Sequence, residues 1–115
     1  MATPVALAAE ANKAGLAANR QGDTHGALAH FLRAIRLQPL RANYIISAGN
    51  MLLKFVPPQT TEAIELYHRA QALELTDKEA RLVAAKLDLA EAYNLEAEQR
   101  VAREETARVL SLIHI

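Results

Sequence analysis

The chain lacks cysteine and tryptophan, and aromatic residues make up only 4% of its 115 residues. Without cysteine it can form neither a disulfide nor a thiolate metal site, and it has no cysteine nucleophile. Chains of this kind suit reducing compartments, because disulfides do not persist there. We therefore expect a cytoplasmic protein.

Neither sign of charge is in excess, since 13 basic residues balance 13 acidic residues and the sequence pI is about 6.9. A balanced chain offers no basic surface for nucleic acid or for anionic lipid. No stretch approaches the ~20 apolar residues that span a bilayer. The first residues, MATPVALAAEANK, lack a basic leader, and Glu10 and Lys13 interrupt the apolar positions. We predict a mature helix there instead of a signal peptide, and neither a nucleic-acid nor a membrane partner.

The sequence motifs of catalysis are also missing. No glycine-rich phosphate loop is present, and Ser47 and Ser111 are not part of a nucleophile elbow. The histidines lack the spacing of a metal site; they are His25, His30, His68 and His114. We predict no catalytic residue, no metal ligand and no cofactor, and we do not expect an enzyme unless the natural chain continues into a catalytic domain.

Strong helix formers dominate the residues that are present. Hydrophobic residues make up 51% of the chain, with alanine and leucine the most frequent, and no β-branched alternation occurs. Gly22, Pro39 and the run FVPPQT interrupt the helical pattern. The sequence therefore predicts an all-α protein, with helices over residues 4–21, 24–38, 41–54 and 60–75 and from residue 77 onward.

Three helix starts carry capping residues. Thr3 precedes Pro4, whose missing N–H costs nothing in the first turn. Asp23 or the threonine after it can cap the second helix. Thr76 and Glu79 have the spacing of a capping box, in which a hydroxyl and a carboxylate satisfy free N–H groups reciprocally. These residues predict where the first, second and fifth helices begin.

Helices that are joined by turns of a few residues lie antiparallel, so the first four form two hairpins. The remaining stretch is ambiguous, because no glycine or proline interrupts residues 77–109. Its apolar stripe consists of Leu82, Ala85, Leu89, Ala92 and Tyr93. Either the chain turns near residues 94–96 to make a third hairpin, or one long helix continues to about residue 110. We favour the hairpin.

The two hairpins repeat one pattern of small and large residues. Gly15 and Gly49 are 34 residues apart. Ala27, Phe31, Ala34 and Leu37 reappear 36 residues later as Ala63, Tyr67, Ala70 and Leu73. The two additional residues fall in the proline-containing loop. We expect the small residues to let the helix backbones of a hairpin approach closely, and the ring to fill the wedge before the next hairpin.

This pattern resembles the tetratricopeptide repeat, whose period is 34 and whose signature runs W-x2-L-G-x2-Y, then A-x3-F, then P. In the third repeat Leu89, Ala90, Tyr93 and Ala102 fit, but Thr106 occupies the aromatic place. The resemblance implies a short right-handed solenoid of stacked antiparallel hairpins in one domain, residues 1–109, with repeats of about 8–41, 42–76 and 77–109.

In this family the first helix of each hairpin lines a concave groove that binds a peptide or a partner helix. The resemblance therefore implies a groove formed by Asn12, Asn19, Arg20, Asn43, Asn50 and Lys54, with Leu16 and Ile46 between them and Glu91 and Asn94 extending it. Asparagine can donate to and accept from a bound backbone. The carboxylate clamp of chaperone-binding members is not matched, because Asp88 stands where that clamp needs an arginine.

Three hypotheses remain open from the sequence. The preferred one is a cytoplasmic bacterial scaffold that binds a protein or peptide partner as a monomer or a weak homodimer. The second is the amino-terminal tetratricopeptide arm of a larger enzyme, of the sulfotransferase, hydroxylase or glycosyltransferase type. The third is a plain helical bundle that self-associates through residues 77–113.

The last six residues, LSLIHI, match the translation of a transposon-end adapter that is used in sequencing libraries. We expect residues 110–115 to be a non-native tail, and the natural chain to continue differently after Val109.

Overall fold

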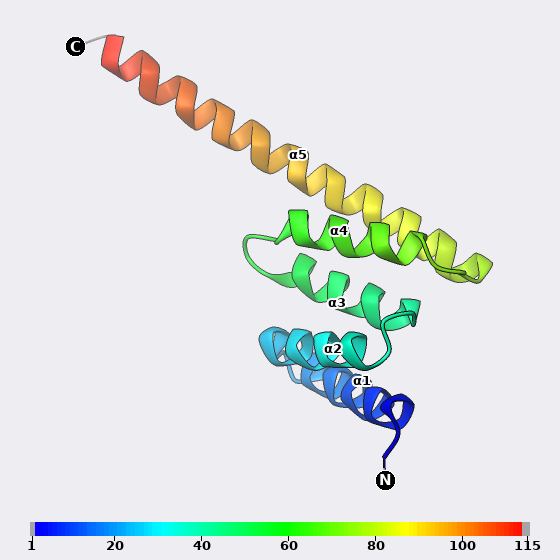
Figure 1. Ribbon diagram of the computed structural model, residues 1–115. Helices are drawn as coiled ribbons and strands as arrows, with labels where there is room; N and C mark the ends of the chain where they lie inside the picture. The colour runs from blue at the N-terminus through cyan, green and yellow to red at the C-terminus, as the bar shows by residue number, and fades with distance from the viewer. Residues whose placement is uncertain (1, 114–115) are drawn as a thin grey trace.

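The computed structural model describes residues 2–113 and contains five α-helices (Figure 1). They are α1 (Pro4–Arg20), α2 (Thr24–Leu37), α3 (Ala42–Lys54), α4 (Thr60–Gln71) and α5 (Asp77–Ile113). No strand occurs among the described residues. The expected all-α class is confirmed, and α1, α2 and α3 and the start of α4 lie close to their predicted bounds.

The predicted caps are formed. The side chains of Thr3 and Asp23 accept hydrogen bonds from the backbone N–H groups three residues further on, at 3.1 and 2.8 Å. Thr76 and Glu79 bond reciprocally at 3.0 and 3.1 Å, as a capping box does. Gly22 follows the end of α1 with a φ of 80°, a backbone conformation that glycine adopts without strain. Local side-chain chemistry therefore fixes these helix ends.

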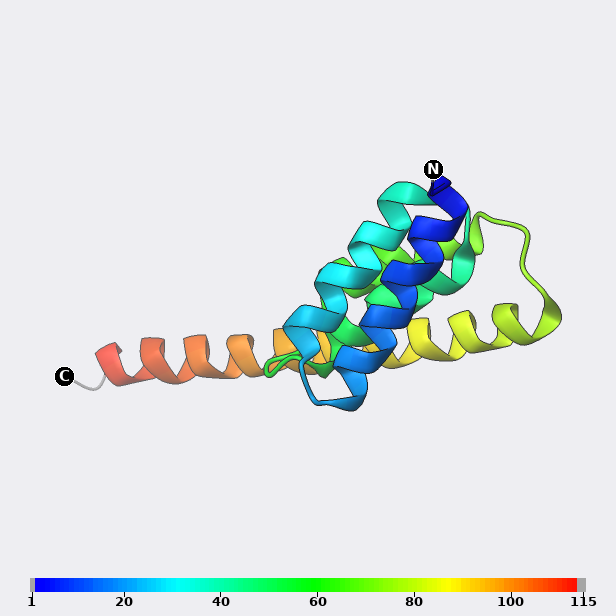
Figure 2. The same cartoon turned by 90° about the horizontal axis from the view of Figure 1, so that it is seen from below.

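The helices pack in consecutive order as a stack of antiparallel hairpins, α1 with α2 and α3 with α4, and α5 then covers α4 (Figures 1 and 2). Half of the buried hydrophobic residues are alanines, and the largest side chains that are fully buried belong to Tyr67, Phe31, Ile45 and Val83. Helix α4 ends at Gln71, before the expected end at residue 75, because Thr76 must leave the helical conformation to cap α5.

Each hairpin contains a contact between a glycine and an aromatic ring. A Cβ atom on Gly15 would lie 2.6 Å from the ring of Phe31, and one on Gly49 would lie 2.7 Å from the ring of Tyr67. Both rings are buried. The glycines were expected to bring two backbones together, but their nearest neighbours are ring atoms of the partner helix. Glycine is therefore needed to make room for the ring.

The prediction of a third hairpin was wrong. The chain does not turn near residues 94–96, and one helix of 37 residues runs from Asp77 to Ile113. With no glycine or proline in this stretch, nothing in the sequence stops the helix that the capping box starts. The principal extents are 70 × 29 × 21 Å, and the radius of gyration is 17.9 Å, whereas about 13 Å is typical of a compact chain of this length.

Only the first half of α5 packs against the stack. Val83, Leu87 and Ala90 are buried, at the spacing of one helix face, and α4 covers them. The apolar stripe that was predicted from the sequence is instead exposed to solvent; it consists of Leu82, Ala85, Leu89, Ala92 and Tyr93. Residues 98–113 are all exposed and form an arm that projects beyond the hairpins (Figure 2). The predicted tail continues this helix as far as residue 113, and its last two residues lie outside the described residues.

Candidate functional site

The six residues of the predicted groove lie on two helices of the stack. Asn12, Asn19 and Arg20 belong to α1, and Asn43, Asn50 and Lys54 belong to α3. Arg20, Asn43 and Lys54 are exposed, and the other three are partly buried. The structure therefore leaves polar and cationic groups accessible on the first helix of each hairpin.

Helix α3 has only one side open to solvent. Asn43, Asn50 and Lys54 are separated by seven and four residues, and this spacing places them on one helix face. The opposite sides of α3 are covered by its neighbours in the stack. Ile46, which was expected between the asparagines in the groove, is only 5% exposed, and it belongs to the core instead of the binding face.

A hydrogen bond joins the two helices on this face. Lys54 Nζ donates to Asn19 Oδ1 at 2.7 Å, although the two residues are 35 positions apart in the sequence. Arg20 follows Asn19 directly and is exposed, so two cations lie at the carboxyl-terminal ends of α1 and α3. The sequence predicted both residues for the groove but not the bond between them. This end of the face offers donors that suit an acidic or carbonyl oxygen.

Asn50 has a structural partner. The hydroxyl of Tyr67 donates to Asn50 Oδ1 at 2.7 Å, and burial raises the pKa of Tyr67 well above its usual value. In the first hairpin the corresponding pair is Leu16 and Phe31, which contain no polar side-chain atoms. Asn50 therefore satisfies a buried hydroxyl, and its acceptor oxygen is already engaged within the protein.

Asn94, which was expected to extend the groove, has partners within the protein. Its Oδ1 accepts a hydrogen bond from Thr60 Oγ1 at 3.0 Å, and its amide donates to Glu98 at 3.3 Å. Thr60 is the first residue of α4, so Asn94 lies on the stripe of α5 that faces α4, together with Leu87 and Ala90. Its spacing of four residues from Ala90 is the sequence signal that could have indicated this position. Glu91 is exposed.

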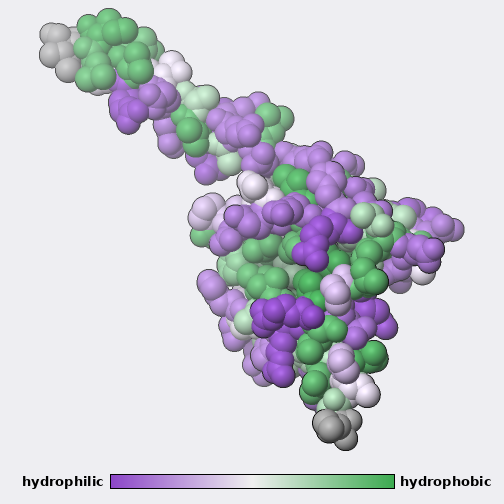
Figure 3. Space-filling view, viewed as in Figure 1, coloured by the Kyte–Doolittle hydropathy of each residue, from purple (hydrophilic) through white to green (hydrophobic). Residues whose placement is uncertain are grey.

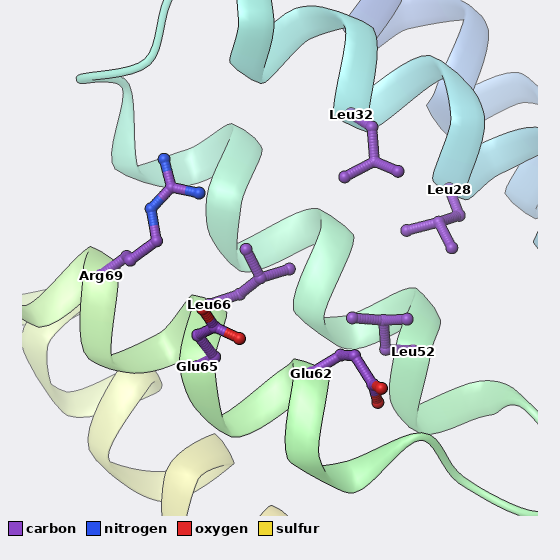
Figure 4. A pocket seen from close by; sticks show the side chains of 7 residues that line it. All are labelled: Leu28, Leu32, Leu52, Glu62, Glu65, Leu66 and Arg69. Carbon is purple, nitrogen blue, oxygen red and sulfur yellow. The ribbon is translucent and has the colours of Figure 1, made fainter.

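A hollow elsewhere on the stack was not predicted from the sequence. It has a volume of about 270 Å³ and lies between α2 and α4, and α3 contributes to its lining (Figure 4). Its apolar lining consists of Leu28, Leu32, Leu52 and Leu66, and its polar rim of Glu62, Glu65 and Arg69. Leu52 lies nine residues after Asn43, which at about 100° per residue places it half a turn away on α3. The hollow therefore opens on the side opposite the asparagine face.

On the face of the hairpin stack that Figure 3 shows, hydrophobic and hydrophilic side chains are mixed. The ring of His25 packs on Phe55 with a centroid distance of 4.5 Å, and His68 Nδ1 lies 3.3 Å from Gln71 Oε1. Within residues 2–113, no three His, Asp or Glu side chains lie close enough to hold a metal ion. None of the described helices is both long and apolar enough to cross a membrane. His114 lies outside the described residues.

No protein-family model matches the chain, and no curated protein matches it. The geometry alone therefore has to indicate a role. It offers a stack of packed hairpins, a polar face on α1 and α3, and an apolar hollow on the opposite side.

Proposed function

We propose that the chain is an interaction module of the tetratricopeptide type, which binds an extended peptide or a partner helix across the face of α1 and α3. The observation that carries the proposal is the bond from Lys54 to Asn19, which joins the two helices on a face where polar side chains are exposed. Two hairpins with the same contact between a glycine and a ring support the resemblance to that family. The lack of cysteine supports a reducing compartment such as the bacterial cytoplasm.

The chemistry of the face favours an acidic partner. Arg20 and Lys54 offer charged donors, and Asn43 offers both a donor and an acceptor to a peptide backbone. Each contact of an exposed charge contributes at most about 1 kcal/mol. A ligand of useful affinity must therefore engage several of these side chains along both helices, as an extended peptide with a carboxylate group can.

Binding of the full chain to an array of extended peptides of varied charge tests the proposal. We expect acidic peptides to bind, and the variants Asn43→Ala, Lys54→Ala and Arg20→Ala to weaken binding several-fold. Asn50→Ala is a poor probe, because it removes the partner of the Tyr67 hydroxyl and so changes stability as well.

The matched control is Arg33→Ala, which removes an exposed cation from α2, outside the proposed face. Peptides that bind equally well to the wild type and to all three face variants would place the binding site elsewhere. A loss of binding in Arg33→Ala as large as that in Lys54→Ala would indicate an unspecific effect of net charge and would reject the assignment.

A further inference from the structure

Helix α5 carries a stripe of alternating large and small apolar residues that no part of the described chain covers. Leu82 and Leu89 are 42% and 39% exposed, and Ala85 and Ala92 lie between and beyond them at the same helical spacing. Lys78 precedes the stripe and Glu96 follows it on the same face, and both are exposed. Val83 and Leu87, which pack on α4, lie on nearly the opposite side of the helix.

The uncovered stripe is self-complementary when it is read in both directions. From one end its six positions are Lys, Leu, Ala, Leu, Ala and Glu, and from the other they are Glu, Ala, Leu, Ala, Leu and Lys. If the helix is laid against an antiparallel copy of itself, every leucine faces an alanine and each lysine faces a glutamate. Facing large and small residues interdigitate, which is how helices pack closely.

We propose that two copies of the chain associate through α5, which pairs antiparallel with α5 of the second copy. The two-fold axis passes between the two stripes at the level of residue 87 along the helix. Leu82 then faces Ala92 of the second copy, and Ala85 faces its Leu89. Lys78 faces Glu96 of the second copy, so one ion pair closes each end of the four apolar layers. Because the same patch is used on both copies, the interface is closed and adds no third chain.

The position of the stack leaves room for this pairing. Helix α4 and the hairpins behind it lie on the far side of α5 from the apolar residues of the stripe, so the two stacks lie on the outside of the helix pair. The loop that contains Pro57 and Pro58 lies beside the end of the stripe, where it lines a hollow together with Glu96. Each α5 then covers the stripe of the other. The exposed arm, residues 98–113, takes no part in these layers, and the proposal is therefore independent of the predicted tail.

Two like-charged contacts limit the strength of the pair. In this register Asp88 lies near Asp88 of the second copy on one edge, and Lys86 lies near Lys86 on the other edge. Like charges across an interface are unfavourable. We therefore expect a weak dimer, which dissociates on dilution.

The first test is the mass of the full chain by sedimentation equilibrium over roughly 5 to 500 µM, the range in which small interfaces dissociate. The mass should rise from the 12.6 kDa of one chain toward twice that value. Leu89→Glu should abolish this rise, whereas Leu95→Glu, an exposed position outside the stripe, should leave it unchanged. A wild-type chain that stays monomeric throughout this range would overturn the proposal.

The second test fixes the register by exchanging charges. Lys78→Glu and Glu96→Lys should each raise the dissociation constant about tenfold, because each places two like charges at both ends of the pair. The double variant should restore wild-type association. Asp88→Asn should strengthen association, because it removes the repulsion at the axis. If the double variant is no tighter than the single ones, the two residues do not face each other and the register is wrong.

The third test uses the lack of cysteine in the chain, which makes cross-linking specific. Leu82→Cys and Ala92→Cys should form few disulfide dimers alone, but a mixture of the two should cross-link efficiently under mild oxidation. In the antiparallel pair residue 82 of one copy lies next to residue 92 of the other, so a disulfide forms only between the two different variants. If each variant cross-links with itself, the helices are parallel and the proposed arrangement fails.

Discussion

The ring of Tyr67 lies against Gly49, so closely that a Cβ atom on this glycine would be 2.7 Å from the ring, and the hydroxyl at the end of the ring donates to Asn50. In the first hairpin Phe31 lies against Gly15 in the same way, and Leu16 follows that glycine. The two hairpins therefore contain one packing unit in two versions. A tyrosine is paired with an asparagine in one, and a phenylalanine with a leucine in the other.

The first prediction concerns replacement of the polar pair, Tyr67 and Asn50, by the phenylalanine and leucine of the first hairpin. Asn50→Leu should destabilise the fold by about 1–3 kcal/mol, because it leaves a buried hydroxyl without a partner. Tyr67→Phe should cost about 0.5–1.5 kcal/mol, since the amide of Asn50 keeps some access to water. The double variant Tyr67→Phe/Asn50→Leu reproduces the first hairpin and should recover most of the loss. Urea unfolding measures all three, and additive losses in the double variant would contradict the coupling.

Gly49→Ala tests the contact between the glycine and the ring. Alanine favours a helix by about 1 kcal/mol over glycine, but overpacking a tight contact costs about 1–3 kcal/mol. We expect a net loss of about 1 kcal/mol, seen as a lower melting temperature. Asn43→Ala, on the exposed side of the same helix, is the control and should not lower it. A Gly49→Ala variant that melts higher than the wild type would show that the ring can move aside.

The packing of the two hairpins was predictable because it depends on local signals. Gly15 and Gly49 recur with the rings of Phe31 and Tyr67 at a nearly constant period, and capping residues mark the ends of the helices. The bond between Asn50 and Tyr67 was not foreseen. An asparagine on the outer face of a helix gives the same sequence pattern whether its side chain binds a ligand or forms a hydrogen bond with a neighbouring hydroxyl.

Helix α5 was predicted less well for a physical reason. In a helix rich in alanine and leucine, two stripes satisfy the same spacing, one through Leu82 and Leu89 and one through Val83 and Leu87. The period cannot decide which stripe packs on α4. The spacing of apolar residues also cannot locate a turn in a stretch that has no helix-breaking residue. The structure contains one long continuous helix, which was the second alternative.

Alkaline pH should destabilise the fold through Tyr67. Burial holds the pKa of its hydroxyl above the usual value in the folded state. The unfolded chain then loses this proton at about pH 10, while the folded chain keeps it. The contribution of the neutral hydroxyl to stability is therefore complete below about pH 10 and is lost as the pH rises further. Unfolding free energies measured from about pH 8 to 11 should fall more steeply for the wild type than for Tyr67→Phe. Parallel curves would contradict this assignment.

The projecting arm of α5 should contribute nothing to the stability of the hairpin stack. Every residue from 98 to 113 is exposed, and the hydrogen bond from Thr60 to Asn94 joins α4 to α5 before this arm begins. A chain that ends at Ala97 should therefore unfold at the same urea concentration as the full chain, although its helical circular dichroism signal is smaller. A chain that ends at Ala90 loses Asn94, the hydrogen-bond partner of Thr60. Its free energy of unfolding should be lower by about 1 kcal/mol or more, so it should unfold at a lower urea concentration. An isolated helix of this length is marginal in water, so proteases should also cut the arm before the stack. If removal of residues 98–113 lowers stability as much as removal of residues 91–113, the arm contacts the stack in solution.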